Sequence, residues 1–347
     1  MTRLSATPSR PGSRVRLPVT GIAGCLVVAF MLLACLGSLP FTLARTDAGP
    51  RYAVGSLDHA RLPPGEGGVL GTDHLGRSVA TRVLVGGAIS LIVGISAGLM
   101  AVTIGTLYGS LAGYAGGRID AAMMRLVDIL YGLPYVLLVV LLAVAGNAVT
   151  DEYQARTRER ARWIAERVAV SAEPRASEAI EAEALAAVPP RVISDRTRVA
   201  LDTLTLLVAI GSVSWLTMAR VVRGQVLSLK ARPFVEAARA AGASPARIFA
   251  RHLLPNLVGP IVVYATLTVP QAILQESFLS FLGIGIKPPL PSWGNLAADG
   301  LSELNAYRSH WWLLATPCVL LAMTLLALNF LGEGLREIVD PRGRERG

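Results

Sequence analysis

The residues that most often bind metals or attack substrates are few in this sequence of 347 residues, and they lie far apart. They are the four histidines, His59, His74, His252 and His310, and the three cysteines, Cys25, Cys35 and Cys318. Neither set has the spacing of metal ligands, and cysteines inside apolar stretches are typical of small buried side chains. No G-x-x-x-x-G-K-[ST] segment that would hold nucleotide phosphates occurs either. The sequence therefore predicts no catalytic residue, no metal site and no bound cofactor.

One acidic residue, Glu276, lies in the middle of an apolar stretch that runs from Leu257 to Gly283. A carboxylate is costly inside a membrane, so such a residue often marks a transport pathway. It can equally be a partnered residue at an interface between helices. We take Glu276 as a possible pathway residue and keep both interpretations open.

The most specific pattern in the sequence predicts two short helices joined by a sharp turn. Good helix formers fill Glu236–Ala241, and Gly242 can take the left-handed conformation that ends a helix. Ser244 and Pro245 are suited to cap and begin the second helix, which Pro255 is expected to end.

The second of these helices carries Ile248, Phe249 and Leu253 along one side. The two helices are too polar to cross a membrane. They offer a small apolar surface surrounded by charged residues, and such a surface fits a groove in a partner protein.

Long apolar stretches dominate the rest of the chain, which is 52% hydrophobic and only 16% charged. A soluble domain carries about a quarter charged residues, so this composition indicates a membrane protein. Six stretches approach or exceed the roughly 20 residues that a helix needs to cross a bilayer. They are 19–43, 83–113, 124–145, 201–222, 257–283 and 311–331. Because backbone groups in lipid must be paired internally, we predict an all-α membrane protein with six transmembrane helices.

The placement of arginine and lysine predicts that both termini face the cytoplasm. The N-terminal segment, the connections 114–125 and 223–256, and the tail from Gly332 then lie inside, and most of them are basic, as the positive-inside rule requires. The first apolar stretch exceeds the roughly 7–15-residue core of a cleaved signal, so we expect it to anchor the chain.

The connection 147–200 is the main break in composition, and it would lie outside the membrane. Its nine arginines disagree with the positive-inside rule, but nine acidic residues balance them. Segments near or above about 60 residues are translocated regardless of charge. We expect a solvated helix over Asp151–Val170 and then a more disordered stretch up to Pro190.

The segment from Glu236 to Asn256 resembles the EAA loop of ABC importer permeases in residue types, spacing and position between two spans. In that family the loop docks in a groove of the cytoplasmic ATPase. The resemblance therefore implies an ATPase-coupling loop. Its residues in this sequence are Glu236, Ala237, Ala238, Gly242, Ile248, Phe249, Leu254 and Pro255.

Further segments resemble the second permease subunit of dipeptide, oligopeptide and nickel importers. They are 70–78 (LGTDHLGRS), 113–120, 124–128, 277–283, 291–295, 329–336 and 340–342. Ser78 departs from the family, in which an aspartate is usual, and the connection 147–200 is far longer than the short one typical of such permeases.

The resemblance implies a type I ABC importer permease fold in the bacterial inner membrane and no enzymatic activity in this chain. It implies a heterodimer with a second permease subunit, two cytoplasmic ATPase subunits and a periplasmic substrate-binding protein. ATP-driven closure would draw the coupling loops together and pass substrate inward by alternating access, provided that binding differs between the two states. Peptides are the expected cargo, nickel is next, and glutathione or an opine is a further candidate.

We divide the chain into three parts. Residues 1–82 hold the N-terminal cytoplasmic tail, the first span and a periplasmic segment. Residues 83–340 form the permease domain with the inserted segment 147–200, and residues 341–347 are a cytoplasmic tail. The main alternative function is a self-sufficient secondary transporter, which would favour intramembrane charges and broken helices at the midplane. Nucleic-acid binding is not expected despite the net charge of +9, because the arginines lie at the ends of apolar stretches.

Overall fold

Helices account for almost all of the regular structure in the part of the chain that the computed structural model describes. That part comprises residues 18–170, 174–187, 194–305 and 309–339, so the predicted tail 341–347 and most of the N-terminal tail lie outside it. The elements are α1 (Val19–Gly37), α2 (Leu39–Thr42), β1 (Arg45–Thr46), β2 (Gly49–Pro50), η1 (Leu57–His59), α3 (Val79–Ala115), α4 (Gly117–Tyr131), α5 (Tyr135–Val170), α6 (Pro174–Ala187), α7 (Asp195–Lys230), α8 (Pro233–Ala240), α9 (Pro245–Ile248), η2 (Phe249–Leu253), α10 (Leu254–Phe281), α11 (Trp293–Ser302) and α12 (Trp312–Val339).

Five helical segments within the described residues are long and apolar enough to cross a membrane: Val19–Thr42, Val79–Ala115, Thr197–Lys230, Pro245–Phe281 and Trp312–Ile338. A sixth candidate is a bent pair, Gly117–Tyr131 with Tyr135–Gly146, whose two parts meet at 88°. The predicted all-helical membrane fold is confirmed, with five spans or, if the bent pair counts as one, six.

The prediction of one continuous helix over residues 124–145 is wrong, because the chain breaks between α4 and α5. Pro134 has no backbone N–H to donate, and its ring disfavours the helical conformation at Leu133. Gly132, directly before them, has little preference for the helix. The chain therefore turns sharply here and leaves the direction of α4.

The inserted segment is more ordered than the sequence indicated. The predicted helix over Asp151–Val170 is present, but it is the far part of α5, a single helix of 36 residues that rises about 54 Å at 1.5 Å per residue. The prediction of a more disordered stretch is wrong for Pro174–Ala187, because these residues form α6. This helix packs back on α5, with Ala184 buried and an ion pair of 3.0 Å between Arg167 and Glu183. We call this pair of helices the α5–α6 hairpin.

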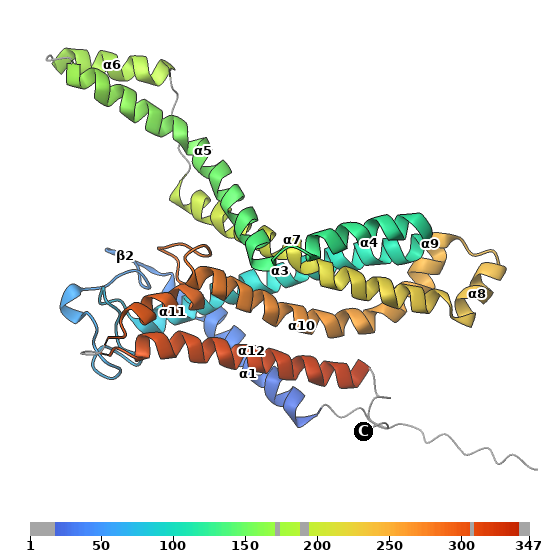
Figure 1. Cartoon of the computed structure of the whole chain (residues 1–347). Helices are drawn as coiled ribbons and strands as arrows, with labels where there is room; N and C mark the ends of the chain where they lie inside the picture. The colour runs from blue at the N-terminus through green and yellow to red at the C-terminus, as the bar shows by residue number, and fades with distance from the viewer. Residues whose placement is uncertain (1–17, 171–173, 188–193, 306–308, 340–347) are drawn as a thin grey trace, which may run out of the picture.

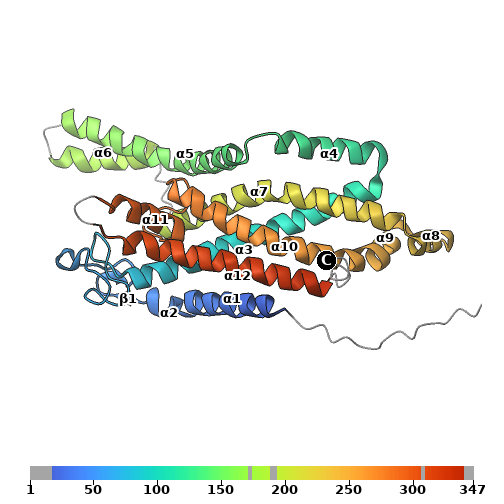
Figure 2. The same cartoon turned by 60° about the horizontal axis from the view of Figure 1, so that its bottom comes forward.

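The α5–α6 hairpin and the short helices α8 and α9 lie at opposite ends of the bundle (Figure 1). The start of α1 and the end of α12 lie at the end that holds α8 and α9. The strands β1 and β2 and helix α11 lie at the end from which the hairpin projects, and a second view shows the same arrangement (Figure 2). We call the end that holds α8 and α9 the loop end, and the end from which the hairpin projects the hairpin end. Both described chain termini thus lie at the loop end.

Close backbone packing joins the first and last helices of the bundle. A Cβ atom on Gly24 of α1 would lie 2.6 Å from the carbonyl oxygen of Ala327 in α12, and one on Gly21 would lie 2.9 Å from the Cα of Gly334. Small residues permit this approach between helices in a membrane, where packing replaces the hydrophobic effect as the driving force.

Candidate functional site

The loop end carries the two short helices that the sequence predicted. α8 ends at Ala240, and Gly242 follows with φ +78°. No atom lies within 4 Å of a Cβ built on Gly242, so the glycine is required by the backbone conformation and not by a lack of space. The Ser244 hydroxyl accepts a hydrogen bond from the backbone N–H of Arg247 at 3.4 Å, and Pro245 begins α9. The predicted turn and cap are confirmed.

The expectation that Pro255 ends the second helix is wrong. A π-helical turn, Phe249–Leu253, follows α9 and leads directly into α10, which holds Pro255 in its first turn. The first turn of a helix is where proline is tolerated, because the missing N–H would have no partner within the helix there. The backbone N–H of Leu254 donates to the carbonyl of Phe249 and continues the helical path.

The apolar side chains of this loop point into the bundle. Ile248, Leu253 and Val235 are buried, and they pack with Met218 and Val226 of α7. The apolar surface expected from Ile248 and Leu253 is therefore used to hold the loop on α7. This packing fixes α8 and α9 against the end of the transmembrane helices.

Phe249 is half-buried, and its ring meets that of Tyr114 edge to face, with centroids 6.3 Å apart. Tyr114 lies at the end of α3. The loop therefore contacts a second transmembrane helix besides α7.

The exposed side of the loop carries most of the remaining predicted coupling residues. Exposed are Glu236, Ala237, Gly242, Leu254 and Pro255, whereas Ala238 is half-buried. The sequence analysis did not include Phe234, which is 41% exposed and lies beside the ring of His252. An adjacent pair of apolar residues on a short helix, Phe234 and Val235, was the available signal, because only one of them can face the core.

Ion pairs fasten α7 to its neighbours just beside this loop. Arg223 of α7 pairs with Asp120 of α4, and Arg220 of α7 donates to Asp128 at 2.8 Å. The Lys230 ammonium, at the end of α7, donates to the carbonyl oxygens of Tyr114 at 2.7 Å and Gly113 at 3.2 Å. These carbonyls belong to the last turn of α3, where a cation is favourable. These contacts join the loop end of α7 to both α3 and α4.

Glu276, the possible pathway residue, is completely buried. The hydroxyls of Ser280 and Ser277 donate to its carboxylate at 2.7 and 3.3 Å, and those of Ser90 and Ser292 join the same cluster. These serines come from α3, from α10 and from the N-cap of α11. These contacts join α3, α10 and α11 through one carboxylate, and a role of Glu276 in the pathway stays a prediction.

A cavity of about 290 Å³ opens between α4, α5, α7 and α10. It is lined by Leu130, Tyr131, Leu133, Tyr135, Val213, Ser214, Leu216, Thr217, Gln271 and Gln275. The Tyr135 hydroxyl donates to the side-chain oxygen of Gln275. The sequence analysis missed this site, although two glutamines four residues apart in an apolar helix were a usable signal.

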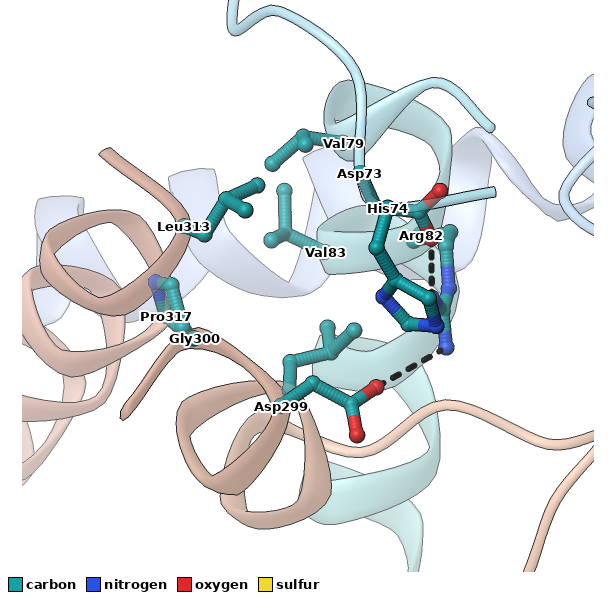
Figure 3. A pocket seen from close by; sticks show the side chains of 10 residues that line it. Asp73, His74, Val79, Arg82, Val83, Asp299, Gly300, Leu313 and Pro317 are labelled. Carbon is teal, nitrogen blue, oxygen red and sulfur yellow. Dashed lines mark hydrogen bonds and ion pairs between the residues drawn. The ribbon is translucent and has the colours of Figure 1, made fainter. Parts of the chain in front are cut away.

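A cluster of charged side chains lies at the hairpin end (Figure 3). It surrounds Asp73, in the segment just before α3. The Asp73 carboxylate accepts hydrogen bonds from the backbone N–H groups of Leu75 and Arg77 at 2.9 Å, and it pairs with the guanidinium groups of Arg77 and Arg82. Arg82 also lies 3.7 Å from Asp299 of α11. Burial acts to raise the pKa of Asp73, but the backbone hydrogen bond and the two arginines outweigh it and hold the pKa below its usual value.

This cluster explains the segment LGTDHLGRS, whose Asp73 and Gly76 form a turn. Gly76 has φ +71°, and a Cβ there would lie 1.8 Å from the carbonyl oxygen of Ser56. Ser78 follows as the N-cap residue of α3, but its side chain makes no capping hydrogen bond. Among the described residues no three His, Cys, Asp or Glu side chains gather as a metal site would require.

Comparisons with known proteins agree on one family. Residues 105–345 match the family of binding-protein-dependent transport system inner membrane components. The chain is 37% identical over 334 residues to the dipeptide transport system permease protein DppC of Bacillus subtilis, covering 95% of this chain and 84% of the relative. It is 42% identical over 319 residues to the oligopeptide transport system permease protein OppC of Escherichia coli strain K12, covering 92% and 84%. It is 34% identical over 326 residues to OppC of Haemophilus influenzae, covering 93% and 85%.

Proposed function

This chain belongs to the family of binding-protein-dependent transport system inner membrane components, and on that premise we propose that it carries di- or oligopeptides into the cytoplasm. It is a multi-pass inner membrane protein, the permease of its ABC transport system and not the ATPase. The proposal rests on one observation. More than nine tenths of the chain matches dipeptide and oligopeptide permeases. Peptides therefore rank ahead of nickel as cargo.

The complete transporter contains, in this proposal, a second permease subunit, two ATPase subunits and a periplasmic substrate-binding protein. The family's description, which names a binding protein and an inner membrane component, supports an assembly of several chains. The loop end faces the cytoplasm, and the hairpin end faces the periplasm. Support comes from the basic segments of the sequence and from the two chain termini, which lie at the end that holds α8 and α9.

The coupling site lies on the exposed side of α8 and the turn after it. Glu236, Ala237 and Gly242 are accessible there, and Phe234 and Leu254 add apolar area. Such a surface, apolar in part and rimmed by charge, suits a groove in the ATPase. Ile248 and Phe249 act behind it, because they transmit the position of the loop to α7 and α3.

Transport follows from a change in the distance between two such loops. When the ATPases close on ATP, they draw the loops of the two permease subunits together. α8 is joined to α7, and the π-helical turn joins α9 to α10, so both transmembrane helices tilt with the loop. ATP can shift the equilibrium between two states only by the difference in its binding free energy to them. Binding must therefore differ between the state that receives substrate from the binding protein and the state that opens to the cytoplasm.

Uptake by a deletion strain that carries the plasmid-borne gene tests this function. We expect labelled dipeptides or tripeptides to accumulate in an ATP-dependent way, and nickel not to accumulate. Affinity purification of the chain from membranes should bring an ATPase with it. Uptake that persists without ATPase subunits would instead identify a self-sufficient secondary transporter.

A further inference from the structure

The cavity between α4, α5, α7 and α10 lies within the part of the bundle that crosses the membrane. At 1.5 Å per residue, Ser214 lies about 24 Å along α7 from Lys230, and Gln271 lies about 25 Å along α10 from Leu254. Both Lys230 and Leu254 are at the loop end of their helices. The hydrocarbon core is about 30 Å thick, so a helix that enters it at the loop end carries these side chains inside it, nearer to the face at the hairpin end.

Two polar side chains on this cavity have no hydrogen-bonding partner in the part of the chain that the structure describes. Gln271 and Thr217 are exposed, and among the described residues no hydrogen bond uses either side chain. An amide or hydroxyl that faces lipid at this depth would cost several kcal/mol, because nothing there can bond to it. The face that carries Gln271 and Thr217 must therefore be covered by something polar.

The remaining polar groups of the cavity indicate which kind of ligand group can cover this face. Gln275 accepts from Tyr135 and from Ser214 through its side-chain oxygen, so its amide nitrogen remains as a donor. Gln271 offers a donor and an acceptor, and Thr217 offers both in one hydroxyl. No Asp, Glu, Lys, Arg or His side chain lines the cavity. This set matches a ligand group that is neutral and carries one donor and one acceptor.

We propose that this cavity binds the backbone amide groups of a peptide in transit, with Gln271, Gln275 and Thr217 as its hydrogen-bonding partners. The inference rests on the proposed function and names the substrate contact within it. Peptide bonds are the part shared by all peptides, so contacts with them tolerate any side chain. With about 290 Å³, the cavity lies at the lower limit of small-molecule sites, about 300–1,000 Å³, and so holds a short stretch of the peptide at a time.

Thiol labelling of the assembled transporter tests whether the cavity is open to water and to peptide. The variant Gln271→Cys is reconstituted in lipid nanodiscs with its partner subunits and ATP, and the unsubstituted chain provides the background of its three cysteines. A charged methanethiosulfonate reagent is added with binding protein that is either empty or loaded with trialanine. We expect labelling with empty binding protein and at least three-fold slower labelling with trialanine. Equal rates, or no labelling in either state because the partner permease or lipid seals the face, would overturn the proposal.

Uptake by the variant Gln271→Leu tests whether the contact is with the backbone. The change removes a polar group that has no hydrogen-bonding partner among the described residues, so folding should not suffer. We expect uptake at saturating peptide to fall about five-fold, the loss expected for about one hydrogen bond, and equally for neutral, lysine-containing and glutamate-containing tripeptides. The matched control is Gln225→Leu in α7, outside the cavity, and it should transport normally.

The outcomes separate the two proposals. If the wild-type transporter takes up no peptide, the proposed function is wrong. If the wild type takes up peptides while Gln271→Leu is unaffected or loses uptake of only one charge class, the function stands and the backbone contact is wrong.

Discussion

The guanidinium of Arg223 donates two hydrogen bonds, of 2.6 and 2.7 Å, to the two carboxylate oxygens of Asp120 and so joins α7 to α4. A bidentate pair of this kind fixes orientation as well as distance. It lies next to the proposed coupling loop, where α7 leads into α8. α4 is therefore expected to follow α7 when the loop moves.

The first prediction concerns this pair. Asp120→Asn should lower peptide uptake per ATP hydrolysed by about two- to five-fold, the range for a partly exposed ion pair, because α4 would no longer follow α7. Reconstituted uptake and phosphate release measure it. Asp128→Asn is the control, since that carboxylate makes one hydrogen bond and is 65% exposed, and it should have the smaller effect. Equal coupling in Asp120→Asn and the wild type would contradict the linkage.

A second prediction concerns the turn after α8. Gly242→Ala should strain the turn by about 1–2 kcal/mol, because the residue holds a left-handed conformation. Gly242→Asp and Glu236→Arg should abolish transport and ATPase association while the protein still inserts in the membrane. Gly224→Ala is a matched control, because that glycine is helical and also has open space around it. Normal uptake by both Gly242→Asp and Glu236→Arg would contradict the proposed coupling site.

Orientation in the membrane gives a third prediction. Reporter fusions after Ala145 and at Arg175 should report the periplasm, and fusions near Lys230 and after Asp340 should report the cytoplasm. The physical reason is the excess of arginine in the segments at the loop end. A cytoplasmic signal at Arg175 would reverse the assignment of both ends.

A fourth prediction concerns the charge cluster at the hairpin end. Asp73→Asn should destabilise the chain by up to about 3–5 kcal/mol, because it leaves Arg82 buried with a weaker partner. Asp299→Asn should cost far less, since its carboxylate is 46% exposed and 3.7 Å from Arg82. Thermal unfolding in detergent compares the two variants. A similar loss in both would place the stabilising contact elsewhere.

The same carboxylate makes stability depend on pH in a defined direction. The folded pKa of Asp73 is below its ordinary value of 3.8, so its contribution is complete above that value and is lost as pH falls through the folded pKa. The difference in melting temperature between the wild type and Asp73→Asn should stay constant above about pH 5 and shrink below about pH 4. A difference that shrinks between neutral pH and pH 6 would implicate another group.

The last prediction concerns the α5–α6 hairpin. A deletion of residues 153–191 with a short Gly/Ser linker should leave folding and ATPase association intact, because α6 packs on α5 and not on the bundle. If the hairpin docks the binding protein, the apparent affinity of uptake should weaken and depend less on salt. Unchanged uptake at every substrate and salt concentration would mean that the segment is only an insertion.

Local signals were sufficient to predict the turn after α8. Gly242, Ser244 and Pro245 act through their own backbone preferences, which do not depend on the rest of the fold. The fate of Pro255 was not predictable in this way. A proline ends a helix or begins one according to its position in the turn, and a π-helical turn placed it at the start of α10.

Packing decided the features that the sequence did not reveal. Ile248 and Phe234 are both apolar and both on the loop, and only the contact of Ile248 with α7 determines which is buried. Likewise, Gln271 and Tyr135 come from different helices, and the cavity between them depends on the bend after Tyr131. Hydropathy averaged over residues 124–145 conceals that bend, although Pro134 marks it.

The contact between α1 and α12 has a consequence for how the chain is made. Among the described helices α1 leaves the ribosome before the others, and the residues that pack on its Gly21 and Gly24 leave about 300 residues later. At about 5–20 residues per second, the roughly 300 residues between them take about 15–60 s to synthesise. During that time the glycine face of α1 lies in the bilayer without its partner. The contact between α1 and α12 is therefore among the last of the bundle to form.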